Sequence, residues 1–488
     1  MERPSVDDFF ADWKQREALV QEMIPVIGRL FSQRDVGIFI YGRPLHNRSV
    51  TFIMKSHRYV RQVEMNEMSE FETHPVLMAL AKLDLWHAQI DLGKLTVRYM
   101  DQLEAKGADA VDVDAFVNEE LGYLDGNKAL PIDKPQDVVL YGFGRIGRLM
   151  ARLLVERTST GEVLRLKAIV VRPGQPGDLE KRAGLFTNDS VHGAFQGTLR
   201  VDAENNCLIA NGNVIKVIYA NSPEEIDYTQ YGIDDALIID NTGKWRDEQG
   251  LMLHLKARGA AKVMLTAPGK GDLKNIVYGI NDSEIGRDDK IVTAASCTTN
   301  AIAPVLRVVQ DKFGISSGHV ETVHAYTNDQ NLIDNYHKGT RRGRSAALNM
   351  VLTETGAAKA VVKVVPELQG KLTGNAVRVP IPNVSMAILM LNLEKQTTKD
   401  ELNEFLRKIA LHSDLQMQIS YTNDPDAVSS DFVGSREAAI VDSNATIVDG
   451  RNCVLYLWYD NEFGYCCQVA RCVYRMAGVT YQVYPQAN

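Results

Sequence analysis

A cysteine and a histidine stand where the surrounding sequence could activate a nucleophile. Cys297 lies in the run Ser296-Cys-Thr-Thr-Asn300, which follows a β-like stretch and precedes a predicted helix over 301–313. Because a helix N-terminus is the positive end of a dipole, we expect the pKa of this thiol to fall from about 8.5 toward neutrality. His324 follows 27 residues later in a second β-rich run. Either residue alone could be an ordinary core residue, but together they predict a cysteine nucleophile with a histidine base.

A glycine-rich loop offers a second kind of chemistry. The segment Gly142-Phe-Gly144-Arg-Ile-Gly147 matches G-x-G-x-x-G, follows the apolar run 137–141 and leads into a predicted helix over 148–157. In that context the glycines allow a tight turn, the approach of a pyrophosphate and close packing of the helix on the strand. The helix N-terminus adds free N–H groups. The loop therefore predicts a dinucleotide site, with a tight turn that binds nothing as the alternative.

The end of the next predicted strand bears on which dinucleotide binds. The strand 164–171 is followed by Arg172, where an NAD-binding unit usually has an acidic residue for the adenine ribose. Asp178 comes six residues later, which is too late for that position. A guanidinium group suits a 2′-phosphate, so NADP is a candidate; a solvated loop arginine is the alternative.

The elements that must position these residues alternate as in a parallel α/β sheet. After the strand–loop–helix–strand unit, a helix is predicted at 249–258. Further strands are predicted at 236–240, 261–266, 276–278 and 291–294. This alternation implies right-handed crossovers and a Rossmann-type arrangement.

The first 134 residues differ in character. Helical periodicity is present at 5–33, 75–105 and 114–124, whereas 37–41 could be a strand or a helix end. Residues 1–135 hold 16 Lys and Arg against 22 Asp and Glu, whereas the remaining 353 residues hold 38 against 40. This charge step and a Gly- and Pro-containing segment predict a boundary near 134. The HxxxR pattern at His57–Arg61 indicates no mechanism.

Composition narrows the class of protein. The 488 residues are 45% apolar and 24% charged, which suits a globular chain of about three domains. A net charge of −8 argues against nucleic-acid or anionic-membrane partners. The sequence has no membrane-spanning run and its N-terminus has no secretory-signal pattern. Its six cysteines lack CxxC spacing, so we expect no metal and a cytoplasmic protein.

Eight sequence blocks carry a family resemblance. YGFGRIGR, NDSVHG, ASCTTN, HAYTNDQ, TGAAKAV, PELQGKLTG, RVPIPNVS and WYDNEFGY occur in the order and spacing of the phosphorylating glyceraldehyde-3-phosphate dehydrogenase family. The resemblance spans about 137–478, some 70% of the chain. It implies an α/β fold with a Rossmann dinucleotide-binding domain at 135–296, an α+β catalytic domain at 297–462, and a C-terminal helix at 463–488 that returns to the dinucleotide-binding domain. The resemblance stops at the segment 1–134, which its periodicity predicts to be a mostly α-helical N-terminal extension.

The resemblance also implies a reaction and its residues. Cys297 would attack D-glyceraldehyde 3-phosphate, His324 would act as acid and base, and inorganic phosphate would cleave the thioester to 1,3-bisphosphoglycerate, reversibly, in glycolysis and gluconeogenesis. The implied cofactor contacts are Gly142, Gly144, Arg145, Ile146, Gly147, Arg172, Thr242, Gly243, Asn461 and Tyr465. The contacts implied for the substrate phosphate are Thr327, Asp329, Arg342 and Arg378, and those for the attacking phosphate are Ser296, Thr298, Thr355, Gly356 and Arg378.

Two departures from the family pattern affect the cofactor. NAD-specific members have Asn-Asp where this chain has Val171-Arg172, and Leu-Pro where it has Asn335-Tyr336. Both changes remove features that disfavour a 2′-phosphate. We therefore expect use of NAD or NADP, with NADP favoured.

Two other functions remain open at this point. Erythrose-4-phosphate dehydrogenase shares the scaffold but hydrolyses its thioester, and the retained Thr355-Gly356 pair favours phosphorolysis instead. A non-catalytic regulatory or binding protein is the second, although Cys297, His324 and Asn461 are all kept. Because family members are usually homotetramers with a loop near 329–347 between subunits, we expect a homotetramer. The extension is expected to dock on its own catalytic core or to bind an unknown regulator.

Overall fold

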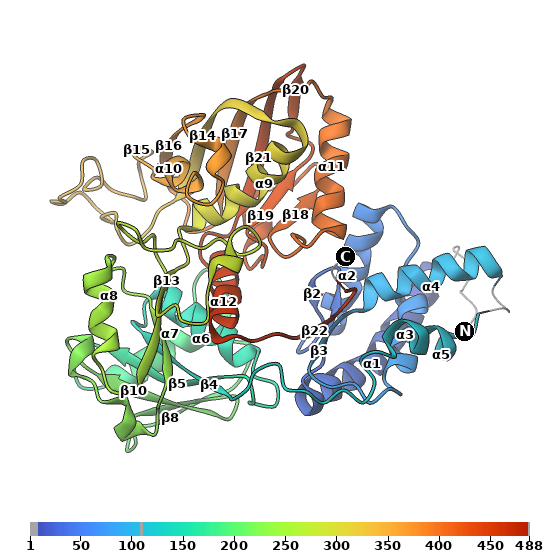
Figure 1. The fold of residues 1–488 in the computed structure, drawn as a ribbon, viewed down its shortest axis with the longest axis horizontal. Coiled ribbons are helices and arrows are strands. Elements are labelled where there is room, and N and C mark those ends of the chain that lie inside the picture. The colour runs from blue at the N-terminus through green and yellow to red at the C-terminus, as the bar shows by residue number, and fades with distance from the viewer. Residues whose placement is uncertain (1–7, 108–110, 487–488) are drawn as a thin grey trace. The chain divides into compact units, whose positions relative to one another are not determined.

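The computed structural model describes residues 8–107 and 111–486, and the chain divides into two compact units (Figure 1). The first unit combines 1–135 with the short stretches 158–163 and 479–488. The second unit comprises 136–157 and 164–478. The first unit is therefore assembled from segments that are far apart in the sequence.

The first unit packs helices around a small sheet in the strand order β2-β1-β3-β22. β1 and β22 are both parallel to β3, and β2 is antiparallel to β1. The strands are β1 (Gly37–Ile40), β2 (Arg43–Pro44), β3 (Ala88–Asp91) and β22 (Gln482–Tyr484). The helices are α1 (Phe9–Arg34), α2 (Val50–Glu64), α3 (Glu70–Leu80), α4 (Leu92–Lys106) and α5 (Val113–Leu121).

The predicted continuous helix over 75–105 is wrong. α3 ends at Leu80, β3 follows, and only then does α4 begin. His87 adopts a φ of 48°, which breaks the helical path, and the Asp91 carboxylate accepts the N–H of Lys94 to cap α4. The ambiguous stretch at 37–41 is settled as β1, because its backbone pairs with β3.

A buried carboxylate joins the three stretches of the first unit. Asp35 accepts the hydroxyl of Tyr481 at 3.1 Å and that of Ser159, and it lies 3.2 Å from His87 Nδ1. The last described residues thus bind the first unit, whereas the sequence analysis took 463–488 as one returning helix. That helix, α12 (Phe463–Ala477), ends before them and packs against α6 (Arg145–Glu156).

The HxxxR pattern supplies hydrogen bonds from α2 to α3 and to the segment just before it. His57 is fully buried, with Nε2 2.8 Å from Thr73 Oγ1 and Nδ1 2.9 Å from the Ile53 carbonyl oxygen. Burial lowers the pKa of His57, which favours the neutral ring. Arg61 donates to the Met68 carbonyl at 3.2 Å. The pattern is explained by packing.

A mixed sheet in the order β13-β12-β11-β4-β5-β10-β9-β8 forms the dinucleotide-binding part of the second unit. Its members from β13 to β10 run parallel, while β9 and β8 are antiparallel additions. The strands are β4 (Gln136–Tyr141), β5 (Leu164–Val171), β8 (Leu199–Asp202), β9 (Cys207–Ala210), β10 (Asn213–Tyr219), β11 (Ala236–Asp240), β12 (Ala260–Leu265) and β13 (Ile291–Thr293). With α6, the helices are α7 (Asp178–Thr187) and α8 (Glu248–Leu255); β6 (Asn188–Asp189) and β7 (Gly193–Ala194) form a separate pair.

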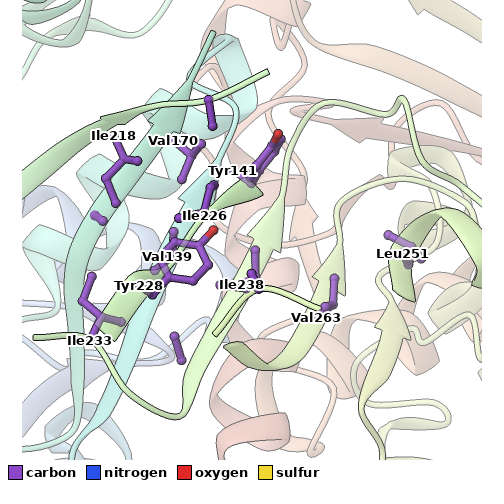
Figure 2. Close-up of a cluster of buried hydrophobic side chains, with 14 of the residues drawn as sticks. Val139, Tyr141, Val170, Ile218, Ile226, Tyr228, Ile233, Ile238, Leu251 and Val263 are labelled. Atoms are coloured by element: carbon purple, nitrogen blue, oxygen red, sulfur yellow. The ribbon is translucent and has the colours of Figure 1, made fainter. Parts of the chain in front are cut away.

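Apolar side chains of these strands pack together in a core beneath α8. Figure 2 shows part of it, with Val139, Val170 and Ile238 from neighbouring strands. Leu251 of α8 is fully buried in the same cluster, as expected where parallel strands are covered by helices. The predicted strand over 276–278 is absent: Asn275 makes only an isolated bridge to Thr293.

A second mixed sheet carries His324 and Arg378, in the order β15-β16-β14-β17-β21-β19-β18 with β20 paired to β21. The strands are β14 (Ile315–Ala325), β15 (Val351–Thr353), β16 (Leu372–Val379), β17 (Ser385–Leu393), β18 (Ile419–Thr422), β19 (Ala439–Asp442), β20 (Ile447–Asp449) and β21 (Asn452–Tyr459). The helices are α9 (Cys297–Phe313), α10 (Ala357–Val361) and α11 (Lys399–His412). Throughout the described ranges, every helix falls short of the length or apolar content that crossing a bilayer requires.

Candidate active site

Cys297 is the first residue of α9, so this helix begins four residues before the predicted start at 301. Ser296 caps it, its Oγ accepting the N–H of Thr299 at 3.0 Å. Ala295 has a φ of 52°, a left-handed conformation that costs an alanine about 1 kcal/mol or more. The Tyr465 hydroxyl donates to the Ala295 carbonyl at 2.9 Å. The strained turn is thus held from behind, and it delivers Cys297 at the helix N-terminus.

Strand β14 brings His324 to this sulfur. Cys297 Sγ lies 3.5 Å from His324 Nε2, which is hydrogen-bonding distance for sulfur. The imidazole is buried and Cys297 as a residue is partly exposed, whereas the other five cysteines are buried. The structure therefore brings together the two residues that the sequence analysis chose as nucleophile and base.

Arg378 completes the group from the neighbouring strand. His324 and Arg378 are register partners in the parallel pair β14–β16. Arg378 Nη1 lies 2.8 Å from His324 Nδ1 and 2.9 Å from the Ala325 carbonyl oxygen, which is itself 2.8 Å from Nδ1. A carbonyl oxygen has two lone pairs, so we assign it both the Arg378 N–H and the Nδ1–H. The Nε2 lone pair then faces the thiol.

The expectation of a lowered thiol pKa is wrong in direction. Burial raises the pKa of Cys297, and Arg378 with the N–H groups at the start of α9 only partly opposes this. Burial, with Arg378 adding to it, lowers the pKa of His324 to about 3. The helix dipole competes here with desolvation, and desolvation dominates. Both shifts favour the neutral forms, a thiol beside an imidazole.

Two residues that sequence reasoning missed support the pair. The Tyr459 hydroxyl lies 3.0 Å from Thr298 Oγ1 and 2.7 Å from Thr322 Oγ1, and its ring meets the His324 ring edge-on at 6.0 Å. Ser385 accepts the Ala325 N–H at 3.1 Å and donates to Asn461 Oδ1 at 2.8 Å. Tyr459 precedes Asn461 in the block WYDNEFGY, which was the available signal; nothing in the sequence marked Ser385.

The residues expected to bind phosphates differ in their contacts and in their surroundings. Arg378 is at the pair, and burial lowers its pKa, with Cys297, Arg342 and Asp329 all close enough to influence it. Asp329 is ion-paired with Arg342. The Ser296 and Thr298 hydroxyls contact Thr299 and Tyr459 respectively.

Three further residues assigned to the phosphates lie in loops. Thr355 accepts the Ala357 N–H at 3.2 Å, just before α10. Thr327 and Gly356 are exposed.

The glycine loop leaves donors free at the start of α6. Gly144 is the N-cap residue and offers no side-chain cap, so the first N–H groups, those of Arg145, Ile146 and Gly147, have no intrahelical or side-chain acceptor. A Cβ on Gly147 would lie 2.2 Å from the Gly142 carbonyl oxygen, and Gly142 has a φ of 96°. Both positions therefore require glycine, and the resulting turn fits a pyrophosphate.

The side chain of Arg145 is already committed. Its guanidinium is ion-paired with Glu462 and lies 3.1 Å from Asp189. His192 Nε2 is 3.2 Å from the same Glu462 carboxylate. Arg145 can therefore serve a cofactor through its backbone N–H, while its guanidinium ties α6 to the segment before α12.

The corner after β5 carries an uncompensated cation. Arg172 directly follows β5 and is exposed, and within the described part of the chain no carboxylate pairs with it. Asp178 is in the first turn of α7 and is ion-paired with Arg182 at 2.5 Å. Asp178 is thus occupied elsewhere.

Together these features define a class of protein: a Rossmann-type dinucleotide-binding chain with a cysteine–histidine pair at a helix N-terminus. The family model for the glyceraldehyde 3-phosphate dehydrogenase NAD-binding domain matches residues 136–248, and that for the C-terminal domain of the same family matches 296–461. The chain belongs to the glyceraldehyde-3-phosphate dehydrogenase family.

Relatives divide according to how much of the chain they cover. A glyceraldehyde-3-phosphate dehydrogenase-like protein of Pseudomonas aeruginosa (strain UCBPP-PA14) is 59% identical over 466 residues, 95% of this chain and 100% of its own. The glyceraldehyde-3-phosphate dehydrogenase of Zymomonas mobilis is 40% identical over 67% of this chain and 94% of its own. The chloroplastic enzyme A of Zea mays is 38% identical over 74% and 87%. Coverage of 95% must include most of the first unit.

The neutral pair makes the thiol sensitive to Arg378. We expect Arg378→Gln to remove the charge that favours the thiolate and to move the pH profile of Cys297 alkylation by iodoacetamide upward by about one pH unit. The profile would be followed by mass spectrometry of the Cys297 peptide. Arg378→Lys keeps the charge and should move the profile less. An unchanged profile in Arg378→Gln would contradict the assigned interaction.

Proposed function

We propose that the chain is a phosphorylating glyceraldehyde-3-phosphate dehydrogenase that oxidises D-glyceraldehyde 3-phosphate, with inorganic phosphate and NAD or NADP, to 1,3-bisphosphoglycerate in glycolysis and gluconeogenesis. The observation that carries this proposal is the 3.5 Å contact between Cys297 Sγ and His324 Nε2 at the N-terminus of α9. Its setting supports the assignment, because the sulfur lies beside a base whose other nitrogen is already hydrogen-bonded.

The proposed mechanism uses the pair for proton movement. As Sγ attacks the aldehyde carbon, His324 Nε2 takes the thiol proton and returns it to the new oxyanion, which gives the thiohemiacetal and leaves the ring neutral again. Nε2 then accepts the hydroxyl proton of the thiohemiacetal as the C–H bond breaks and a thioester remains on Cys297. The bound dinucleotide supplies the hydride acceptor. Inorganic phosphate attacks the thioester carbon, and Cys297 leaves as the thiolate.

Arg378 links anion binding to the base. It lies 2.8 Å from His324 Nδ1 and is assigned to both proposed phosphate sites. An anion that pairs with the guanidinium would offset its charge, so the pKa of His324 would rise from its low value and the ring would be a stronger base. Substrate binding would then itself prepare the proton acceptor.

The cofactor is proposed to lie on the uncapped start of α6, beside the Thr242–Gly243 turn. The free N–H groups of the first helical turn and the two positions that admit only glycine support this site. Asn461, whose carbonyl oxygen accepts from Ser385, is assigned to the nicotinamide carboxamide, and Tyr465 to the region beside the ring. Arg172, free of a carboxylate partner within the described ranges, supports a preference for NADP.

Cys297→Ser should fold and bind dinucleotide but lose turnover by about a thousandfold or more, because a serine hydroxyl is far less nucleophilic. The measurement is the initial rate of cofactor reduction with glyceraldehyde 3-phosphate. The wild-type rate with glyceraldehyde 3-phosphate should also depend on inorganic phosphate. Turnover of erythrose 4-phosphate in the absence of both phosphate and arsenate would instead favour erythrose-4-phosphate dehydrogenase. Retention of most activity in Cys297→Ser would refute the nucleophile, and a wild type inert on both aldehydes would favour the non-catalytic alternative.

The charge of Arg172 is expected to affect the choice between NAD and NADP. We expect kcat/KM for NADP to equal or exceed that for NAD in the wild type, and Arg172→Asp to shift the ratio toward NAD by about tenfold or more. The aspartate would repel a 2′-phosphate and accept from a 2′-hydroxyl. Lys181→Asp, on the neighbouring helix, controls for general charge. A wild-type preference for NAD above about a hundredfold would reject the proposal.

We also propose a homotetramer. Large apolar side chains are exposed along 332–352, namely those of Leu332, Ile333, Tyr336, Leu348, Met350 and Leu352. Exposed apolar groups gathered in one segment are typical of a contact surface. Sedimentation of the full chain should give four copies, and the double change Leu332→Asp and Ile333→Asp should give smaller species. A wild-type monomer would contradict the proposal.

A further inference from the structure

A buried acid–base pair lies behind the proposed cofactor turn and takes no part in the proposed chemistry. Asp240 is the last residue of β11, and His254 is in the last turn of α8. His254 Nε2 donates to Asp240 Oδ2 at 3.0 Å, and neither side chain is exposed at all. Two ionisable groups in an apolar core are costly unless they are hydrogen-bonded, so such a pair needs an explanation.

The apolar surroundings of the pair leave no room for solvent. The Tyr141 ring meets the His254 ring edge-on at 4.7 Å, and the Trp245 ring does so at 5.6 Å. Tyr141 and Leu251 belong to the core beneath α8 (Figure 2). Within the described residues His254 Nδ1 has no hydrogen-bond partner. The His254 ring is therefore hydrogen-bonded through Nε2 alone within the described residues.

The other oxygen of the carboxylate holds the cofactor turn. Asp240 Oδ1 accepts both the backbone N–H and the hydroxyl of Thr242, each at 2.7 Å. The Thr242 hydroxyl in turn accepts the Lys244 N–H at 3.1 Å. Both donors of Thr242 are thus directed inward. The Gly243 N–H, with no acceptor in the described part of the chain, is the donor that this turn leaves for a ligand.

The turn so held bears directly on the glycine loop. A Cβ on Gly142 would lie 2.9 Å from Thr242 Cγ2, so the Thr242 methyl group packs against the first glycine of the loop. Asn241 reinforces the contact, its N–H donating to the Tyr141 carbonyl at 2.8 Å. A shift of Thr242 would therefore change the space at the start of α6 as well.

We propose that His254 and Asp240 are positioning residues for the cofactor: the pair keeps the Thr242–Gly243 turn in its ligand-ready position before a dinucleotide binds. A turn that is already ordered loses less conformational entropy on binding, and so gives a tighter complex. The inference rests on the proposed use of Thr242 and Gly243 as cofactor contacts. It concerns affinity for the dinucleotide and assigns the pair no step at the thioester.

The test compares direct binding with turnover in the full chain. His254→Leu should raise the dissociation constants of NADH and NADPH, measured by calorimetry, by about tenfold. At saturating cofactor, kcat should stay within about twofold of wild type, because Cys297 and His324 are untouched. His254→Gln places an amide N–H where Nε2 donated and should restore affinity to within about threefold.

Two matched variants separate positioning from loss of packing. His57→Leu removes an equally buried histidine from the first unit; it should lower the thermal midpoint and leave both dissociation constants unchanged. If His254→Leu fails to fold, Thr242→Val and Thr242→Ser are compared instead at the exposed turn. Valine lacks the hydroxyl that donates to Asp240, whereas serine keeps it. Valine should weaken binding and serine should not.

The outcomes are distinguishable. Wild-type affinity in both His254→Leu and Thr242→Val would overturn this inference and leave the proposed function intact. Equal weakening by His57→Leu would show a general effect of destabilisation and would also overturn it. A wild-type chain that binds neither dinucleotide would overturn the proposed function, and this inference with it.

Discussion

The active site depends on the register between β14 and β16. That pairing sets His324 opposite Arg378, so the arginine donates to the Ala325 carbonyl oxygen that is also assigned the Nδ1–H of His324. A shift of one residue in the pairing would turn every β16 side chain to the opposite face and remove the guanidinium from the histidine. Strand β14 also presents His324 Nε2 to Cys297 Sγ at the start of α9. Nucleophile, base and proposed anion site therefore share one backbone constraint.

Burial gives this arrangement its electrostatic character. Desolvation raises the pKa of the thiol and lowers that of the imidazole, so the free protein holds a neutral pair. Nearby groups offset part of that cost: Arg378 favours the thiolate, and the N–H groups at the start of α9 act in the same direction. A neutral resting pair also limits unwanted reaction of the one partly exposed cysteine. Site chemistry and protection thus follow from the same low-dielectric surroundings.

The first unit shows how an added segment becomes integral to its host chain. Its sheet takes β22 from the end of the chain, and Asp35 binds Tyr481 and the Ser159 hydroxyl from two further stretches. Removing residues 1–134 would therefore leave β22 without its partner strand. The acidic extension is thus a structural partner of the stretches 158–163 and 479–486 of the same chain.

Local patterns made several parts of the molecule predictable. The β5 and β11 runs match their predicted bounds at 164–171 and 236–240, because parallel strands covered on both faces are continuous apolar runs. The predictions failed where long-range contacts compete with helical periodicity. Residues 88–91 lie in an apparent helix but pair with β1 and β22, and the run at 276–278 finds only an isolated bridge. Helix starts were also missed, because a cap such as Ser296 depends on backbone geometry.

By itself, the sequence determined the glycine loop, the cysteine and histidine that the structure brings together, and the family, because these depend on residue types at fixed local spacings. Only the tertiary structure decided the protonation state of the pair, since that depends on how fully the surrounding chain excludes water. It also decided that Arg145 is ion-paired away from the loop and that Asp240 and His254 stand behind Thr242. These contacts join residues that are tens to hundreds of positions apart, and no local pattern encodes a distance between them.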